Sequence, residues 1–203
     1  MLTNLSCCSS NHEGKSNGLP VAIVLVGQGK DILRALLRAD WYETEWTRER
    51  AEIDPAQAYY LFGRLPDAVF RLKRQGGVER NQLDIWLTPW RLDGEPIWMA
   101  QVIHFIGRRN PLQQISFAAR FDPDMDDGRN CMMQNLWYSQ GLKQVAWVDY
   151  GDAVPLEQKR ENFLGAEYFT DGHRMVLWLS GSPVSLLESH SLDWDETPEL
   201  GYR

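Results

Sequence analysis

The sequence has few of the residues that staple a small protein together. It contains three cysteines, and two of them, Cys7 and Cys8, are adjacent and cannot readily pair with each other. No spacing resembles a zinc site or a disulfide framework. We therefore expect no metal, no cofactor and a reducing, cytoplasmic setting. At this length, one hydrophobic core buries roughly 70% of the unfolded chain's surface, so no staple is required.

Long hydrophobic runs and an excess of positive charge are also missing. The longest apolar stretch, residues 19–26, is too short to span a bilayer and lacks the charged start of a signal peptide. The formal net charge is −7, so the chain has no global basic field to attract nucleic acid. We expect no nucleic-acid partner and no transmembrane segment.

Side chains suited to catalysis are sparse. Two of the four histidines, His12 and His190, lie in segments that we expect to be tails. His104 lies among apolar strand residues, where a buried structural histidine is the simpler interpretation, and His173 follows a turn. Neither a nucleophilic serine elbow nor a Cys–His signature is visible. The sequence therefore favours a non-enzymatic role.

The hydrophobic pattern predicts an α+β fold. Residues 21–26 are β-branched and continuous, which indicates a buried strand, and residues 31–39 have helical spacing. Asp93 and Gly94 lie between two apolar runs, which predicts a hairpin. The other expected elements are strands at 59–62, 69–72, 83–92, 96–106, 144–150 and 174–179, and a helix at about 123–140. Their order predicts a single domain with a largely antiparallel central sheet and two main helices.

Composition divides the chain into three parts. Residues 1–18 are rich in Ser, Asn, Gly and Cys, which predicts a disordered lead-in. Residues 19–181 form the expected domain, and residues 182–203 form an acidic tail that drapes over the surface or frays. Within the domain, Trp86, Trp90 and Trp98 are close in sequence, which suggests one sheet face of large flat side chains.

Residues 122–129 place four carboxylates and one arginine directly before an apolar helical run. Asp122 is a preferred N-cap residue, and Pro123 suits the first helical position. Asp126 and Arg129 form an i,i+3 pair. Asp124, Asp126 and Asp127 lie in the first turn, where the positive end of the helix dipole stabilises negative charge. Capping and pairing therefore account for the segment as a helix start.

A functional interpretation places Asp126 and Arg129 inward, beside the Trp-rich hairpin. Such a pair near His104, Asp171 and His173 would suit anion binding or acid–base chemistry, and clustered carboxylates also suit a hard cation such as Mg²⁺. The candidate catalytic residues are Asp126, Arg129, His104 and Asp171. The candidate binding residues are Arg80, Trp86, Trp98, Asp122, Asp126 and Arg129.

Several segments, taken in order, resemble the LssY C-terminal domain family of bacteria. They are residues 24–27, 60–64, 80–86, 97–100, 104–107, 122–129 and 169–172. The resemblance covers about residues 20–180 and is strongest at 122–129. The family has no established activity. Its members often stand attached to integral-membrane modules, including ones similar to type-2 phosphatidic acid phosphatases and to DedA proteins. The resemblance therefore implies a membrane protein as partner, and association with a membrane through that partner.

The chain also departs from the family pattern. Phe105 replaces an aspartate that usually follows the histidine at 104, and Ala119-Arg120 replaces a histidine before the Asp-Pro-Asp segment. Asp84 stands where an arginine is common. These departures indicate a copy that has lost part of any site and retains only binding.

Three hypotheses follow. The preferred one is an accessory or ligand-binding domain beside a membrane or envelope lipid system. The second is a hydrolase that acts on a phosphate-containing substrate through the four catalytic candidates. The third is a protein-interaction domain that uses an apolar patch on residues 59–62 and the hairpin.

Overall fold

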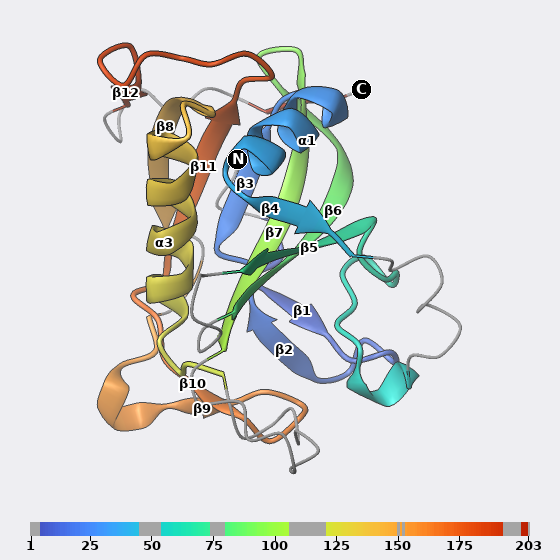
Figure 1. Ribbon diagram of the computed structural model, residues 1–203. Helices are drawn as coiled ribbons and strands as arrows, with labels where there is room; N and C mark the ends of the chain where they lie inside the picture. Colours follow the sequence, from blue (N-terminus) through green and yellow to red (C-terminus); the bar gives the residue numbers. More distant parts are fainter. Residues whose placement is uncertain are drawn as a thin grey trace.

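The computed structural model describes residues 5–44, 54–73, 80–105, 121–149, 151, 153–192 and 200–202. A nine-stranded sheet forms its centre, with helices α1 (Gly29–Arg38) and α3 (Met125–Tyr138) on one face (Figure 1). The strands of this sheet are β3 (Ile23–Val26), β4 (Trp41–Glu43), β5 (Ala68–Lys73), β6 (Arg80–Leu92), β7 (Glu95–Phe105), β8 (Leu142–Asp149), β11 (His173–Leu179), β12 (His190–Ser191) and β13 (Leu200–Tyr202).

The sheet order is β12-β8-β11-β3-β7-β6-β5-β4, and β13 pairs with β6. Two pairs of neighbouring strands are parallel, β11 with β3 and β12 with β8. The remaining pairs in this sheet are antiparallel. Two further pairs of short strands stand apart: β1 (Cys8–Ser10) with β2 (Asn17–Pro20), and β9 (Arg160–Glu161) with β10 (Glu167–Tyr168). The predicted α+β fold, with a largely antiparallel sheet and two main helices, is confirmed.

At its central strand, β3, the sheet is buried on both faces. All four of its residues are buried, as a continuous β-branched run predicts. Ile23 and Leu25 pack against the helices, in a cluster with Ile32 of α1 and Met132 of α3. The alternate residues, Val24 and Val26, pack on the opposite face with Leu5, Trp86 and Met99.

Strands β6 and β7 form the longest hairpin of the sheet. Asp93 and Gly94 connect them with φ angles of 49° and 78°, both in the left-handed region. A two-residue turn with both residues at positive φ matches the right-handed twist of the flanking strands. The hairpin predicted from Asp93-Gly94 is therefore confirmed.

Among the described residues, no helix is long and apolar enough to cross a membrane.

The tryptophans do not line one sheet face. The register pairs Trp86 with Met99 and Leu87 with Trp98, so Trp86 and Trp98 point to opposite sides. Trp86 is fully buried and its indole N–H donates to Arg64 O at 3.2 Å. The indole N–H of Trp98 donates to Gly27 O at 3.1 Å, beside α1. Both are packing residues, and the expected single aromatic face is wrong.

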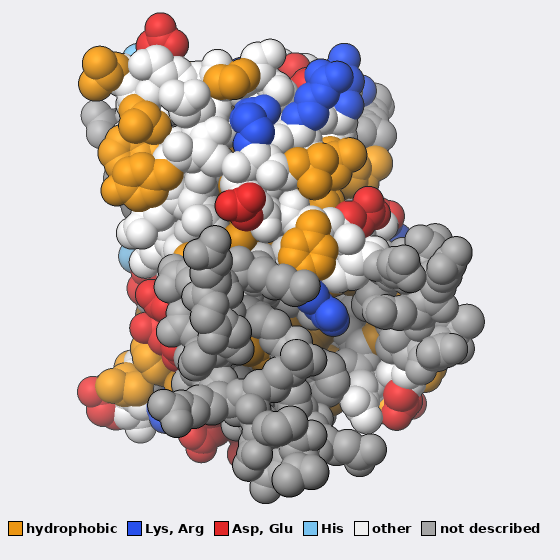
Figure 2. Space-filling view, in the orientation of Figure 1, with side chains coloured by type: hydrophobic (Ala, Val, Ile, Leu, Met, Phe, Trp, Pro, Cys, Tyr) orange, Lys and Arg blue, Asp and Glu red, His pale blue; other side chains and the backbone are white. Residues whose placement is uncertain are grey.

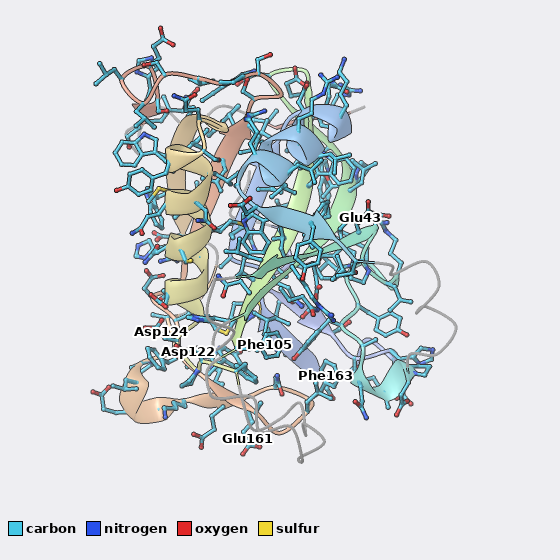
Figure 3. All side chains as sticks on the ribbon, viewed as in Figure 1. Glu43, Phe105, Asp122, Asp124, Glu161 and Phe163 are labelled. Carbon is cyan, nitrogen blue, oxygen red and sulfur yellow. A yellow bond between two sulfur atoms is a disulfide. The ribbon has the colours of Figure 1, made fainter. Side chains whose placement is uncertain are left out.

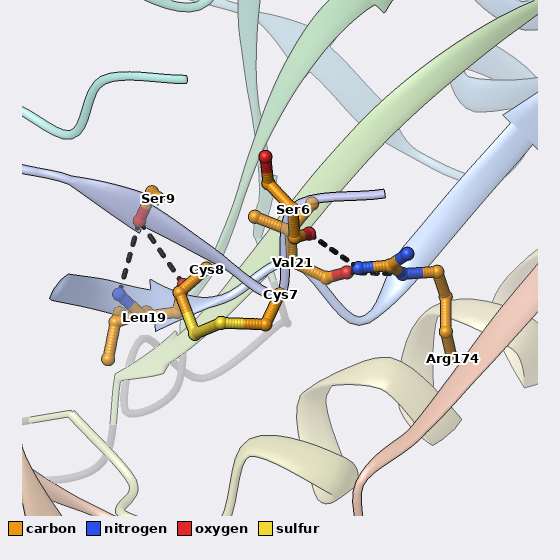
Figure 4. Close-up of a disulfide and its surroundings, with 7 residues drawn as sticks. All are labelled: Ser6, Cys7, Cys8, Ser9, Leu19, Val21 and Arg174. Carbon is orange, nitrogen blue, oxygen red and sulfur yellow. Dashed lines mark hydrogen bonds between the residues drawn. A yellow bond between two sulfur atoms is a disulfide. The ribbon is translucent and has the colours of Figure 1, made fainter. Parts of the chain in front are cut away.

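Residues 5–18, for which the sequence predicts a disordered lead-in, contain β1 and the start of β2. Strands β1 and β2 pair there, Leu5 is buried in the core, and Ser9 holds the pair through bonds to Leu19 N and Leu19 O (Figure 4). Arg174, fully buried, donates to Val21 O at 2.9 Å and to Ser6 O at 2.7 Å. Backbone pairing and one buried arginine therefore order a segment that has few apolar side chains.

The sulfur atoms of Cys7 and Cys8 form a disulfide between adjacent residues (Figure 4). This corrects the expectation that the two cysteines cannot readily pair.

At the other end of the chain, the expected tail contributes β12 and β13 to the sheet. The expected strand at 59–62 is reduced to isolated bridges, such as Ser10 with Tyr60. The division into three parts stays a prediction.

Candidate functional site

Helix α3 starts two residues later than the sequence predicts. The N-cap is Asp124, whose carboxylate accepts from the backbone N–H groups of Asp126 and Asp127. The carboxylate of Asp122 accepts from Asp124 N at 3.0 Å and so forms the turn before the cap. Asp122 and Asp124 lie together at the base of α3, near Phe105 at the end of β7 (Figure 3). Two competent capping residues in succession explain the error in the predicted start.

The first turn of α3 contributes to two separate groups of charged side chains. We call the first the Arg129 clamp and define it as Asp126, Arg129, Thr170, Asp171 and His173. Arg129 donates to both carboxylate oxygens of Asp171, at 2.9 and 2.8 Å, and lies 3.3 Å from Asp126 Oδ1. It also donates to the backbone carbonyl of His173. A guanidinium that binds a carboxylate with two parallel bonds fixes both orientation and charge.

The clamp leaves its carboxylates with little capacity for other partners. Asp126 Oδ1 accepts from Thr170 Oγ1 at 2.8 Å, and Asp126 Oδ2 accepts from Asp171 N at 2.7 Å. Asp171 Oδ1 also accepts from His173 N at 2.8 Å. The clamp thereby ties α3 to the turn before β11.

Burial and charge act differently on the two clamp carboxylates. Arg129 is only 2% exposed, and its guanidinium lies 4.8 Å from the centre of the Trp147 ring. Burial raises the pKa of Asp126 above its ordinary value, and it outweighs the bond from Thr170 and the charge of Arg129. Burial also pushes the pKa of Asp171 upward, but the bonds from Arg129 and His173 outweigh burial, so this pKa is lowered.

The second group, which we call the His104 cluster, consists of His104, Asp122 and Asp127. His104 Nδ1 lies 3.2 Å from Asp127 Oδ2 and 3.9 Å from Asp122 Oδ2. His104 comes from the end of β7, and its carbonyl accepts from Asp122 N at 2.7 Å. Gly128 allows α3 to approach this strand, because a Cβ there would lie 3.0 Å from Val102 Cγ1 and 3.7 Å from His104 Cβ.

The His104 cluster has the composition of a cation site, with wider spacing between its ligand atoms than a bound ion would leave. One ligand atom from each residue lies within 4.8 Å of the other two. Ligand atoms bonded at about 2.1 Å in a tetrahedral arrangement lie about 3.4 Å apart, so the side chains would have to close by up to about 1.4 Å to hold an ion. Imidazole suits Zn²⁺ and carboxylate oxygens suit Mn²⁺, so this mixed set of ligands is compatible with either ion. The side chain of Asp127 is 58% exposed and is able to make this adjustment.

The structure brings together three of the four candidate catalytic residues: Asp126, Arg129 and Asp171. His104 instead pairs with Asp122 and with Asp127, which was not a candidate. Of the binding candidates, Trp86 is a core residue and Trp98 is half-buried against the core. Arg80 begins β6, and its side chain is outside what the structure describes. The contact between Asp126 and Asp171 joins residues 45 positions apart, so no local pattern could reveal it.

Sequence reasoning treated Asp84 only as a lost arginine and missed its burial. Asp84 is 2% exposed on the sheet face opposite the helices, and it accepts from Gln82 and Gln101, each at 2.9 Å. Burial raises its pKa to about 6, against the lowering effects of those two bonds and of the charge of Arg71. Within the described part of the chain, Gln101 Oε1 is buried without a hydrogen-bond partner.

The apolar patch expected on residues 59–62 is small. Tyr60 and Leu61 are buried, whereas Phe62 is 43% exposed and packs edge-to-face on Trp90, with ring centroids 5.9 Å apart. On the face that carries the helices, hydrophobic side chains gather in several separate groups between charged ones (Figure 2). These observations give the protein-interaction hypothesis little support.

The comparison with protein families gives one result. A family model described as the LssY C-terminus matches residues 2–173 of the chain. This range includes the whole Arg129 clamp and the whole His104 cluster. None of the curated proteins and none of the solved structures compared with the chain matches it.

Proposed function

The chain belongs to the LssY C-terminal family, and on this premise we propose that it is a non-enzymatic ligand-binding accessory domain. We infer that it works beside a membrane or envelope lipid system, because members of the family often stand attached to integral-membrane modules. The ligand site that we propose is the His104 cluster, occupied by a divalent cation.

The observation that carries this proposal is the closed state of the Arg129 clamp. A general acid or base must reach the proton that it transfers. Both oxygens of Asp126 and both oxygens of Asp171 are engaged within the clamp, and Arg129 is buried beneath them. These three residues are therefore suited to holding α3 against the sheet, and a substrate would have to break their contacts.

The His104 cluster supports the binding part of the proposal. In it, two carboxylates face one imidazole, and the ion pairs that the structure gives to Asp122 and Asp127 are with His104. A divalent cation would neutralise both carboxylates and would use the imidazole as a neutral ligand. A cation held in this way would provide a contact point for a phosphate or carboxylate group of the partner ligand.

A metal-dependent hydrolase is the second candidate, and the composition of the His104 cluster favours it. Three protein ligands leave open positions on a metal ion, and a water bound there becomes a better nucleophile. This candidate differs from the earlier hydrolase hypothesis because it assigns chemistry to His104, Asp122 and Asp127 and none to the Arg129 clamp.

A turnover assay separates these readings. The purified full chain would be incubated with p-nitrophenyl phosphate and with phosphatidic acid vesicles, each with and without Mn²⁺ or Zn²⁺. We expect no turnover under any condition. Metal-dependent turnover that disappears in His104→Ala but persists in Asp171→Asn would establish the second candidate instead. Turnover that Asp171→Asn or Asp126→Asn abolishes in a folded protein would overturn both and restore the clamp as a catalytic site.

A further inference from the structure

A cavity of about 250 Å³ lies beside the disulfide, and none of its lining residues belongs to the His104 cluster. We call it the disulfide pocket. It is lined by Cys7, Cys8, Pro20, Gly151, Val154, Arg160, Tyr168 and Thr170. A water molecule occupies about 30 Å³ in the liquid, so the pocket has room for about eight waters or one small organic molecule.

The walls of the pocket are held in place before any ligand arrives. On one side, Val21 N donates to Cys7 O at 2.8 Å, and Cys8 pairs with Pro20 across strands β1 and β2. A Cβ on Gly151 would lie 3.7 Å from Cys7 Cβ, so the disulfide packs directly against this second wall. On the other side, Thr170 is fixed by its bond to Asp126 of the Arg129 clamp.

The polar groups of the pocket favour a negative charge. Among the eight lining residues, Arg160 carries the one formal charge, which contrasts with the net charge of −7 for the whole chain. Arg160 of β9 stands opposite Tyr168 of β10. Burial raises the pKa of Tyr168, against the lowering effects of the charge of Arg160 and of a hydrogen bond from it. A tyrosine hydroxyl is a donor as well as an acceptor, so Tyr168 can donate a hydrogen bond to an anion.

The remaining lining is apolar and suits the body of a small ligand. Val154 and Pro20 are buried beside the pocket, and the two sulfur atoms add a polarisable surface. We propose that the disulfide pocket binds a small organic anion, with its phosphate or carboxylate group at Arg160 and Tyr168 and its apolar part against the Cys7–Cys8 disulfide. A phosphate monoester of the size of glycerol 3-phosphate fits both the volume and the charge.

The test is isothermal titration of the full chain with glycerol 3-phosphate, inorganic phosphate, acetate and, as the neutral comparison, glycerol. We expect saturable one-to-one binding of glycerol 3-phosphate and no binding of glycerol. Arg160→Ala should weaken binding at least tenfold, since its exposed side chain contributes charge with little packing. Tyr168→Phe should weaken it several-fold. Lys159→Ala is the matched control, because Lys159 is the neighbouring cation and pairs instead with Glu167 at 3.6 Å. It should change the affinity less than twofold.

A second arm asks where the anion comes from. The same variants would be floated with phosphatidylcholine vesicles that do or do not contain phosphatidic acid. Arg160-dependent flotation without binding of free glycerol 3-phosphate would identify a lipid headgroup as the source of the anion. The proposal is overturned if neither free anions nor vesicles bind, or if Arg160→Ala binds like the wild-type chain. The pocket shares no residue with the His104 cluster, so either outcome leaves the proposed function to its own test.

Discussion

Asp126 and Asp127 are consecutive residues of α3, but their carboxylates belong to different groups. The side chain of Asp126 is 17% exposed and lies in the Arg129 clamp, and that of Asp127 is 58% exposed and faces His104. In the clamp one buried guanidinium contacts two carboxylates, whereas in the cluster one imidazole nitrogen faces two carboxylates. The comparison teaches that closely spaced acidic residues are structural where a buried arginine satisfies them and are binding candidates where, among the described residues, their partner is a histidine.

The largest expected effect is the loss of the guanidinium from the clamp. Arg129→Leu leaves Asp126 and Asp171 without their countercharge, and breaking a buried pair from one side costs about 3–5 kcal/mol. We expect the free energy of unfolding in urea to fall by about 3 kcal/mol or more. Gln134→Leu, on an exposed position of the same helix, should change it by less than about 0.5 kcal/mol. A loss below about 1 kcal/mol for Arg129→Leu would show that the clamp is not structural.

Asp84 extends the comparison to a buried carboxylate that is held by amides. Its pKa rises from 3.8 unfolded to about 6 folded, so the folded state binds the proton more tightly between these values. The stability that this proton contributes is fully present below about pH 4 and is lost as the pH rises through about 6. Asp84→Asn removes this loss and should stabilise the chain at pH 7, relative to the wild-type chain, by up to about 3 kcal/mol.

The measurement for Asp84 is urea unfolding of both chains from pH 4 to pH 7. The difference in stability between Asp84→Asn and wild type should grow in favour of the variant across this range. Parallel pH profiles would contradict a proton on Asp84. Gln101→Leu is a useful companion, because it removes both the amide that donates to Asp84 and the buried Oε1 that lacks a partner among the described residues.

Within the clamp, the two carboxylates should respond unequally. The pKa of Asp171 is lowered, so its charge stabilises the folded chain above its unfolded pKa, and this contribution is lost as the pH falls through the lower folded pKa. The side chain is 41% exposed, so we expect Asp171→Asn to cost only about 1 kcal/mol at pH 7. The pKa of Asp126 is raised, so Asp126→Asn should cost less. The reverse order in thermal unfolding would contradict this assignment of charge.

The smallest effect on stability is expected in the His104 cluster. The carboxylate of Asp127 is exposed and pairs with a histidine, so Asp127→Asn should change the free energy of unfolding by less than about 0.5 kcal/mol without added metal. With Mn²⁺ or Zn²⁺ present, wild type should gain thermal stability and the variant should gain less, because an ion that binds only the folded state stabilises it. Equal gains for both chains would remove Asp127 from the site.

The sequence predicted correctly the features that depend on contacts between neighbouring residues, and it failed where the contacts join residues far apart in the chain. The Asp93-Gly94 hairpin and strand β3 depend on local chemistry, and both were predictable. The structure at residues 5–18 could not be predicted from their own composition. Arg174, far along the chain, contributes to it by donating hydrogen bonds to the backbone carbonyls of Ser6 and Val21. The split of one acidic segment into two groups depends on which strand ends lie beside α3, which composition and periodicity do not reveal.

The most direct test of the account is calorimetric titration of Mn²⁺ and Zn²⁺ into the full chain and two variants. His104→Ala alters the His104 cluster, and Asp171→Asn alters the Arg129 clamp. We expect one ion per chain for wild type, no detectable binding for His104→Ala, and wild-type affinity within about threefold for Asp171→Asn. No binding by the wild-type chain, or equal binding by wild type and His104→Ala, would contradict the claim that the cluster is the binding site and the clamp is structural.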